Sequence, residues 1–497
     1  MNRAVVAIGK WLALLAIAAA LTGQPAWAAS RPDRTLEAEM MAHIQILASD
    51  EFQGREPGTE GEAKTLQYLA SQWAGLGLLS GTNNPGSEWF VPVTLIERQP
   101  AASSAQFFRK GRRVYLPASD VLVLTSGART LLRSAPVLFV GKGSGPVPAR
   151  TELAGRIAVL LDGGIENSDR QNALLAGGAS AVLTVLDGER KLENVAARRK
   201  LPGYALASET TGGDLEVFVN KSAMDRMLQG TRQSVASLQQ AAERPDFVPQ
   251  LLDLTATLEA TTRETTILTH NLIGKLPGKK PDSGALLFVA HWDHFGVCAP
   301  PQAEDTICHG AVDNASGLAA LTELARRLVR GSRLDRDVYF LATTAEELGL
   351  LGAHAFAENP PLPLKQIVAA FNIDTIALAP AGSPLAIVGR GMTPLDADIE
   401  KVAKRAKRQI VDGDAANAYF RRQDGWALAQ HDVPTVMVTS AYSDIPRLEA
   451  FYEGPYHRPA DNLQRRIELG GAAEDVLFYV ELARWFGNSK RVRFPAK

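Results

Sequence analysis

From about residue 271 onward, the chain alternates short apolar segments with amphipathic ones, and this alternation most strongly constrains the fold. Four apolar runs have the length and composition of buried strands: "ALLFVA", "DVYFLATT", "IVAAFNID" and "VPTVMVTS". The segment "ASGLAALTELARRLV" repeats apolar residues at helical spacing. Apolar strands alternating with helices are typical of a parallel sheet covered on both faces. We therefore expect an α/β fold with a mixed, mostly parallel sheet flanked by helices.

The middle of the chain has a different texture. Between about residues 134 and 252, short strands and turns predominate, as in "GRIAVLLDGG" and "ASAVLTVLDG", and this region does not gather His, Asp and Glu. A chain of 497 residues also exceeds a single ordinary core. We predict an inserted, mainly β accessory domain over residues 131–255, interrupting a discontinuous main domain of residues 31–130 and 262–490.

Composition excludes some classes of partner. Apolar residues make up 46% and charged residues 22% of the chain, as in folded globular proteins. The formal net charge of -1 gives no reason to expect nucleic acid or an anionic membrane as a partner.

The first 28 residues are predicted to be a secretory signal peptide. Arg3 and Lys10 precede the apolar run "WLALLAIAAALTG", and Ala26-Trp27-Ala28 provides a small-x-small cleavage site. The run is shorter than the ~20 residues of a membrane-spanning helix, so an uncleaved anchor is the lesser alternative. We expect a periplasmic or secreted protein without stable membrane insertion after cleavage.

The two cysteines, Cys298 and Cys308, lie between "HWDHFG" and "GAVDNASG". In an oxidising compartment they are expected to form one local disulfide. A thiolate metal site is the alternative, and the absence of CxxC spacing argues against it.

Imidazoles and carboxylates follow several of the predicted strands. Ligands of such sheets bind beyond the carboxyl ends of the strands, so these side chains are expected to converge. The sequence places the following residues at strand ends or in adjoining loops: His291, Asp293, Asp313, Glu346, Glu347, Asp374 and His457. Nitrogen and oxygen donors without sulfur suit zinc, with cobalt or manganese as possible substitutes. Two imidazoles and three carboxylates suffice for two ions if one carboxylate bridges them.

The motifs "HWDH", "GAVDNASG", "AEELGLLGA", "FNID" and "YHRPAD" resemble those of the dizinc aminopeptidases, family twenty-eight of the metallopeptidases. The resemblance covers about residues 36–79, which include "LASDEFQGREPGTEGE", and about residues 271–487. It implies a zinc-exopeptidase-like fold and two Zn²⁺ ions. The implied ligands are His291, Asp313, Glu347, Asp374 and His457.

The resemblance also implies individual roles. Asp313 would bridge both ions, with His291 and Asp374 completing one site and Glu347 and His457 the other. Asp293 would accept the second ring N–H of His291. Two further residues would act on the substrate, Glu346 as general base and Tyr456 as hydrogen-bond donor to the developing oxyanion.

The middle segment resembles a protease-associated domain through "ELAGRIAVLLDGG" and "ALLAGGASAVLTV". One departure from the family is a segment where many relatives read Arg-Ser-Asp-His and this chain reads Arg422-Gln423-Asp424-Gly425. Substrate contacts there are therefore expected to differ.

Other histidines have simpler interpretations. His294 is expected to pack or hydrogen-bond locally, His309 to be a solvated loop residue, and His354 to be structural. The glycine-rich stretch "GREPGTEG" needs no function beyond that of a loop.

The resulting expectation is an aminopeptidase acting on peptides with a free N-terminus. A carboxypeptidase or another amide-processing enzyme on the same scaffold is the first alternative, because Arg421 and Arg422 offer guanidinium groups to a terminal carboxylate. A binding protein that has lost catalysis is the second, and the intact ligand set argues against it.

Overall fold

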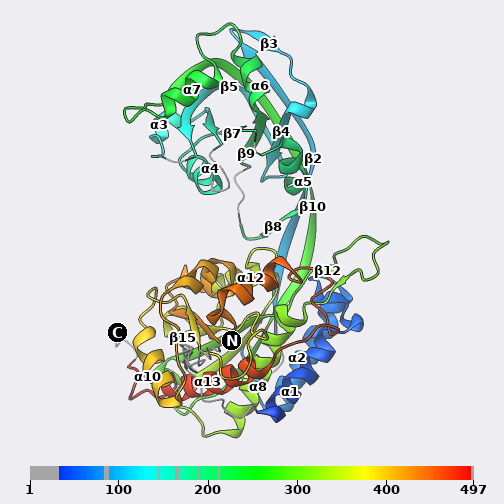
Figure 1. Ribbon diagram of the computed structural model, residues 1–497, viewed down its shortest axis with the longest axis vertical. Helices are drawn as coiled ribbons and strands as arrows, with labels where there is room; N and C mark the ends of the chain where they lie inside the picture. The colour runs from blue at the N-terminus through cyan, green and yellow to red at the C-terminus, as the bar shows by residue number, and fades with distance from the viewer. Residues whose placement is uncertain are drawn as a thin grey trace, which may run out of the picture.

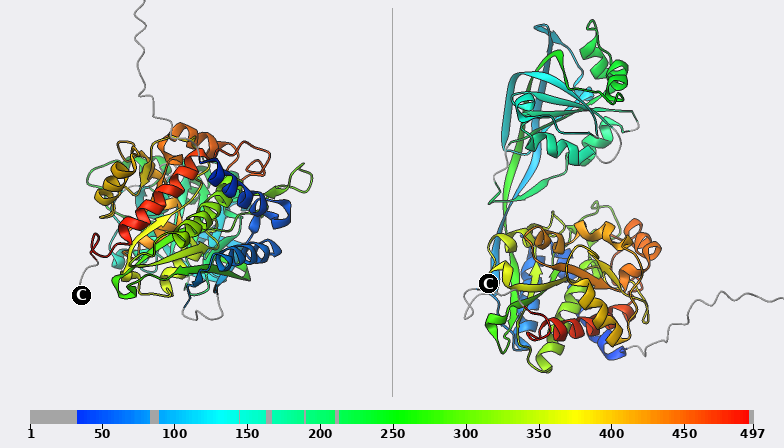
Figure 2. Two further views of the ribbon diagram at one scale, coloured as in Figure 1. Left: turned by 90° about the horizontal axis from the view of Figure 1, so that it is seen from below. Right: turned by 90° about the vertical axis from the view of Figure 1, so that its left-hand side faces the viewer.

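A computed structural model describes residues 33–82, 89–143, 145–162, 167–188, 190–209 and 213–493. The predicted signal peptide lies outside these ranges. Two lobes are visible, and the long antiparallel strands β2 (Phe90–Arg109) and β10 (Gln250–Leu276) run from one into the other (Figures 1 and 2). Among the described residues, no helix combines the length and apolar composition needed to cross a membrane.

The lower lobe is built on a six-strand path with the order β16-β17-β15-β11-β14-β10. The four central strands are parallel, whereas β10 and β16 pair antiparallel at the two ends of the path. The strands not yet given are β11 (Ala285–His291), β14 (Asp337–Thr343), β15 (Ile367–Asn372), β16 (Ala386–Val388) and β17 (Thr435–Thr439). The short β1 (Leu79–Ser80) adds to β10, and β12 (Gly296–Val297) pairs with β13 (Ile307–Cys308). This confirms the expected mixed, mostly parallel sheet.

Helices cover both faces of this sheet because successive strand side chains point in opposite directions. In β11, Leu286 and Phe288 enter one core, and Leu287 and Val289 enter another. The first core includes residues of α1 (Arg34–Leu47), α2 (Glu60–Gly75), α8 (Ser316–Arg330), α10 (Asp396–Ala406), α12 (Ile445–Glu453) and α13 (Gly470–Phe486). The second includes residues of α9 (Leu351–Glu358) and α11 (Asp424–Ala429).

The upper lobe has its own sheet and core. β5, β6, β7 and β9 are parallel neighbours, β4 closes one edge antiparallel, and β10 pairs with β5 at the other. Its strands are β3 (Arg112–Val114), β4 (Val121–Thr125), β5 (Arg129–Lys142), β6 (Ile157–Leu161), β7 (Ala181–Leu186), β8 (Gly203–Leu206) and β9 (Leu215–Asn220). Its helices are α3 (Arg150–Leu153), α4 (Asn167–Ala176), α5 (Leu192–Arg199), α6 (Lys221–Leu228) and α7 (Val235–Ala242). The insert thus contains helices as well as the expected strands.

Two residues before position 131 pack in the core of the upper lobe. Phe107 and Val123 belong to the upper core together with residues of β5, β6 and β7, although the sequence pattern placed the boundary at residue 131. β2 and β10 are each continuous across both lobes, so no turn marks the crossing. We propose that the division falls within these two strands.

Candidate metal centre

The predicted ligands come from separate segments that meet at the carboxyl edge of the lower sheet. His291 is the last residue of β11, Glu347 follows β14, and Asp374 follows β15. Asp313 lies in the irregular turn Ala311–Ala315 that leads into α8, and His457 lies in the loop after α12. Parallel strands bring their carboxyl ends to one edge of the sheet, so these residues lie close together although they are far apart in the sequence.

One group of possible ligands joins His291, Asp313 and Asp374. The Nε2 atom of His291 lies 3.1 Å from Asp313 Oδ1 and 3.4 Å from Asp374 Oδ1. All three residues are buried, and one ligand atom from each lies within 4.8 Å of the others. This spacing allows one ion to contact all three side chains.

A second group forms around the other oxygen of Asp313. The Nε2 atom of His457 lies 3.3 Å from Asp313 Oδ2 and 2.8 Å from Glu347 Oε2. The two carboxylate oxygens of Asp313 therefore face two different imidazoles, that of His291 and that of His457. This is the arrangement that a bridging carboxylate requires.

His294 contributes more than the local packing expected from the sequence. Its Nδ1 atom lies 2.5 Å from Glu347 Oε1, its ring is buried, and it forms a compact group with Asp313 and Glu347. The Glu347 carboxylate thus has an imidazole at each oxygen, His294 at Oε1 and His457 at Oε2. The tertiary fold creates this contact, because Glu347 lies 53 residues further along the chain.

Buried polar atoms without hydrogen bonds show that this cluster fits a cation. Among the described residues, Asp313 Oδ2, His457 Nε2 and His294 Nε2 are buried and have no hydrogen-bond partner. Such atoms carry a free-energy cost that a bound ion offsets. The donors are nitrogen and oxygen, which suits zinc. Both cysteines are excluded as ligands because a disulfide joins Cys298 to Cys308, as the sequence predicted.

The charges of the cluster point the same way. Burial alone would raise the pKa of Asp313, but the neighbouring imidazoles of His291 and His457 lower it well below its ordinary value. Burial lowers the pKa of His457, but contacts with Asp313 and Glu347 outweigh burial and raise it to about 9. The imidazoles of His291 and His457, whose pKa values are both raised, therefore hold protons that balance the carboxylates, and a divalent cation can replace those protons.

Glu346 is placed to handle a proton beside the cluster. Burial raises the pKa of the Glu346 carboxyl well above its ordinary value, and the carboxylates of Glu347 and Asp374 raise it further, whereas His291 opposes the shift. Glu346 also shares a compact group with His291 and Glu347. A carboxyl group with a raised pKa can accept a proton and return it near neutral pH.

Asp293 has a different contact from the one expected. The Nδ1 atom of His291 is 3.2 Å from the main-chain carbonyl oxygen of Asp293, whereas the nearest carboxylate oxygen is 3.8 Å away. The Asp293 carboxylate instead accepts the backbone N–H groups of Glu346, at 3.0 Å, and Glu347, at 3.3 Å. Asp293 thus fixes the imidazole through its backbone and the Glu346–Glu347 loop through its side chain.

Tyr456 lies at the rim of the cluster. Its ring stacks on that of His457, with centroids 3.6 Å apart. The Arg422 guanidinium lies 4.8 Å from the centroid of the Tyr452 ring and 5.8 Å from that of Tyr456, and no carboxylate among the described residues forms an ion pair with it. The rings of Tyr452 and Tyr456 and the guanidinium group of Arg422 therefore lie beside the predicted ligand His457.

Two buried residues hold the ligand loops and were missed from the sequence. Arg55, in the stretch interpreted as a simple loop, donates hydrogen bonds to the carbonyl oxygens of Leu47, Trp292, His309 and Gly310. Asp461 accepts the backbone N–H groups of Val312 and Asp313. Both lie inside the quoted motifs, but their partners are distant in the sequence, so the motifs do not reveal these contacts.

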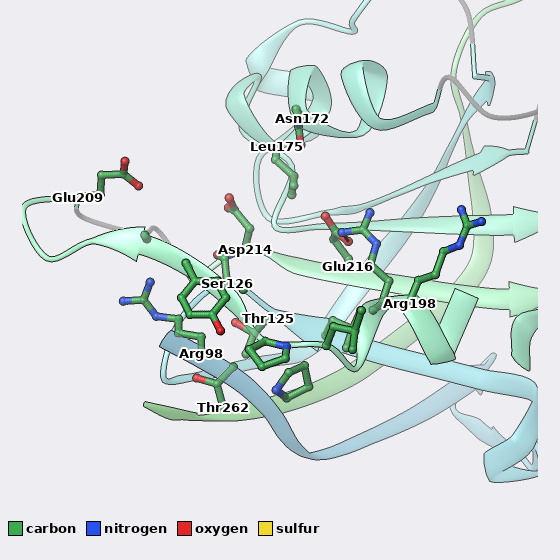
Figure 3. A pocket seen from close by; sticks show the side chains of 18 residues that line it. Arg98, Thr125, Ser126, Asn172, Leu175, Arg198, Glu209, Asp214, Glu216 and Thr262 are labelled. Atoms are coloured by element: carbon green, nitrogen blue, oxygen red, sulfur yellow. Dashed lines mark hydrogen bonds and ion pairs between the residues drawn. The ribbon is translucent and has the colours of Figure 1, made fainter. Parts of the chain in front are cut away.

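A separate cavity of about 660 Å³ lies in the insert, beside β8 and the ends of β4 and β9 (Figure 3). Its lining includes Arg98, Asp214 and Glu216 but, among the described residues, none of the five predicted ligands. The candidate metal centre and this cavity are therefore distinct features.

Comparisons with known proteins agree with this geometry. Residues 271–476 match the family described as peptidase family M28. The chain is 28% identical over 165 residues to the aminopeptidase YwaD of Bacillus subtilis, covering 32% of this chain and 33% of the relative. It is 30% identical over 145 residues to a vacuolar membrane protease of Schizophyllum commune, covering 29% of this chain and 14% of the relative. The chain therefore spans a third or less of these curated relatives.

Among solved structures, the chain resembles an aminopeptidase from Aneurinibacillus sp. strain AM-1, with a TM-score of 0.55 and 18% identity. That match covers 93% of this chain and 96% of the other, so the two share the fold across both lobes.

Proposed function

We propose that this chain, in which residues 271–476 match peptidase family M28, is a dinuclear zinc aminopeptidase. One observation carries the proposal: the two oxygens of Asp313 face the imidazoles of His291 and His457 at 3.1 and 3.3 Å. A bridging carboxylate between two imidazole-bearing sites is the arrangement used by two-metal hydrolases.

The proposed ligands divide around Asp313. His291 and Asp374 complete one site, and Glu347 and His457 complete the other. Cobalt or manganese could substitute, because nitrogen and oxygen sites accept several divalent ions. His294 is proposed to orient Glu347 from its second oxygen, since such contacts usually determine the placement of a ligand.

When bound, the ions would polarise the substrate carbonyl and lower the pKa of a shared water. Glu346 would accept a proton from the attacking water at its carboxylate and deliver it to the amine nitrogen of the leaving group. Its burial supports this role, because a carboxyl group with a raised pKa can return the proton it accepts. Tyr456 would donate its hydroxyl proton in a hydrogen bond to the oxyanion that develops on the carbonyl.

The proposed site of action is the periplasm or the extracellular medium. Support comes from the predicted signal peptide and from the disulfide between Cys298 and Cys308, which is stable in oxidising compartments. The proposed substrates are peptides with a free N-terminus. The insert is proposed to be a protease-associated-like domain that shapes access to the site.

The experiment combines metal analysis with hydrolysis. Protein purified without chelator is expected to contain zinc and to release nitroaniline from a panel of aminoacyl-nitroanilides. The same substrates with acetylated amines are expected to be inert. Hydrolysis of the blocked substrates would overturn the aminopeptidase assignment, and protein without bound metal would favour a binding role instead.

A carboxypeptidase remains the second candidate because Arg422 is exposed and has no carboxylate partner among the described residues. Guanidinium groups bind terminal carboxylates well. Dipeptides blocked at one end decide between the two: a carboxypeptidase requires the free carboxylate, whereas an aminopeptidase requires the free amine.

A further inference from the structure

The loop that carries Glu346 and Glu347 has an unfavourable backbone conformation, which contacts with the surrounding structure must stabilise. Ala345, immediately before Glu346, is fully buried and has a φ of 51°, in the left-handed region that residues with a Cβ atom rarely adopt. Leu350, at the end of the loop, has a φ of 60°. Such conformations persist only where the surroundings hold them in place.

Hydrogen bonds within the lower lobe hold part of this loop in place. Asn271 on β10 accepts the N–H of Thr344 at 2.9 Å and donates to the carbonyl oxygen of Gly352 at 2.8 Å. Asp293 holds the N–H groups of Glu346 and Glu347, as described above. These bonds fix the backbone on either side of Ala345, whereas its methyl group needs packing.

That packing comes in part from the insert. Leu206, the last residue of β8, is 3% exposed and belongs to one apolar cluster with Leu95, Ala345 and Leu351. In the strand register, Leu206 lies opposite Leu95 on β2, and Leu95 in turn lies opposite Ile267 on β10. β8 is thus a third strand paired with β2 beside the β2–β10 pair, and it lies at the lower end of the insert (Figure 1). Through Leu206 it shares the apolar cluster with Ala345 of the loop.

A polar contact follows directly after β8. The Ser208 hydroxyl donates a hydrogen bond of 2.8 Å to Glu358 Oε2, at the end of α9. Because α9 begins at Leu351, the insert contacts this helix at its first turn through the apolar cluster and at its last residue through Ser208.

We propose that Leu206 and Ser208 of the insert are positioning residues for the loop that carries Glu346 and Glu347. The lower lobe then depends on the insert for the placement of Glu346, its proposed general base. This inference rests on the proposed function for its catalytic consequence and on the contacts above for its structural one.

The test compares Leu206→Ala with Leu186→Ala in the full chain. Leu186 is a matched control because it is 1% exposed in the insert and belongs to a cluster made only of insert residues. For Leu206→Ala we expect kcat to fall about 10- to 100-fold, because small displacements of a catalytic group have large effects. KM and zinc content should stay within about twofold, and Leu206→Met should restore most of the rate.

Ser208→Ala is a second variant and is expected to fold normally, because Ser208 is exposed. We expect a smaller loss of kcat, about two- to fivefold, as for one hydrogen bond. Amide hydrogen exchange of residues 344–351 provides a readout independent of activity. Exchange should be faster in Leu206→Ala than in the wild type, and unchanged in Leu186→Ala.

Equal kcat and equal exchange in Leu206→Ala and Leu186→Ala would overturn the inference. If the wild-type protein hydrolyses none of the substrates, the proposed function fails instead. In that case the hydrogen-exchange measurement by itself tests whether Leu206 positions the loop. Unchanged exchange in Leu206→Ala overturns that role.

Discussion

His294 Nδ1 lies 2.5 Å from Glu347 Oε1, so a histidine outside the expected ligand set holds one oxygen of a proposed zinc ligand. Replacing His294 with alanine should weaken zinc binding about 10- to 100-fold, because Glu347 loses the contact that orients it. Competition with a chelating dye measures this affinity. His354→Ala on α9 is the control and should bind zinc as the wild type does. Equal affinities for the two variants would show that Glu347 needs no such partner.

Glu346→Gln tests the proton transfer separately from metal binding. The amide keeps the shape of the side chain but cannot accept a proton, so kcat should fall about 10²- to 10⁴-fold. Zinc content, measured by mass spectrometry, should be unchanged. Glu304→Gln, in the exposed disulfide loop, is the control for the loss of one carboxylate. A near-normal rate for Glu346→Gln would remove this residue from the mechanism.

Arg55→Lys should destabilise the protein by about 3–5 kcal/mol, since each buried carbonyl oxygen left without a donor costs about 1–3 kcal/mol. A lysine ammonium cannot reproduce the planar fork that reaches four carbonyl oxygens. Unfolding in urea, monitored by circular dichroism, gives the free energy. Arg113→Lys, at an exposed position, should leave it unchanged. A loss below about 1 kcal/mol for Arg55→Lys would contradict the clamping role.

These contacts show what sequence reasoning could and could not reach. The positions of His291, Glu347 and Asp374 at one edge of the sheet were predictable. Each residue follows an apolar run, and parallel strands end at one edge of the sheet. The contacts of His294 and Arg55 were not predictable, because their partners lie 53 and up to 255 residues away along the chain. No periodic pattern in the sequence encodes such contacts.

The role of Asp293 was predicted only in part, because spacing does not reveal whether a side chain or its carbonyl oxygen meets a ring. The proposed boundary of the insert likewise has no local signal in the sequence. β2 continues through both lobes, so local sequence carries no sign of the transition.

Glu323 should make stability fall in acid. Burial alone would raise its pKa, but His43, Arg326 and Arg327 lower the pKa to about 2 from an ordinary 4.5. A carboxylate with a lowered folded-state pKa stabilises the protein above the ordinary value, and this contribution is lost as pH falls from 4.5 towards 2.

The wild type and Glu323→Gln should therefore differ most in free energy of unfolding at about pH 5, with the difference shrinking towards about pH 2. Urea unfolding across this range measures the difference. Glu60→Gln, at an exposed position on α2, should show a much smaller effect. A difference between wild type and Glu323→Gln that is independent of pH would contradict the assigned shift.

The most direct test of the central claim is an anomalous diffraction map of the zinc-loaded protein, recorded at the zinc absorption edge. The account predicts two peaks about 3.5–4 Å apart, with the Asp313 carboxylate between them. His291 and Asp374 should border one peak, and Glu347 and His457 the other. A single peak, or two peaks that do not share Asp313, would contradict the dinuclear centre.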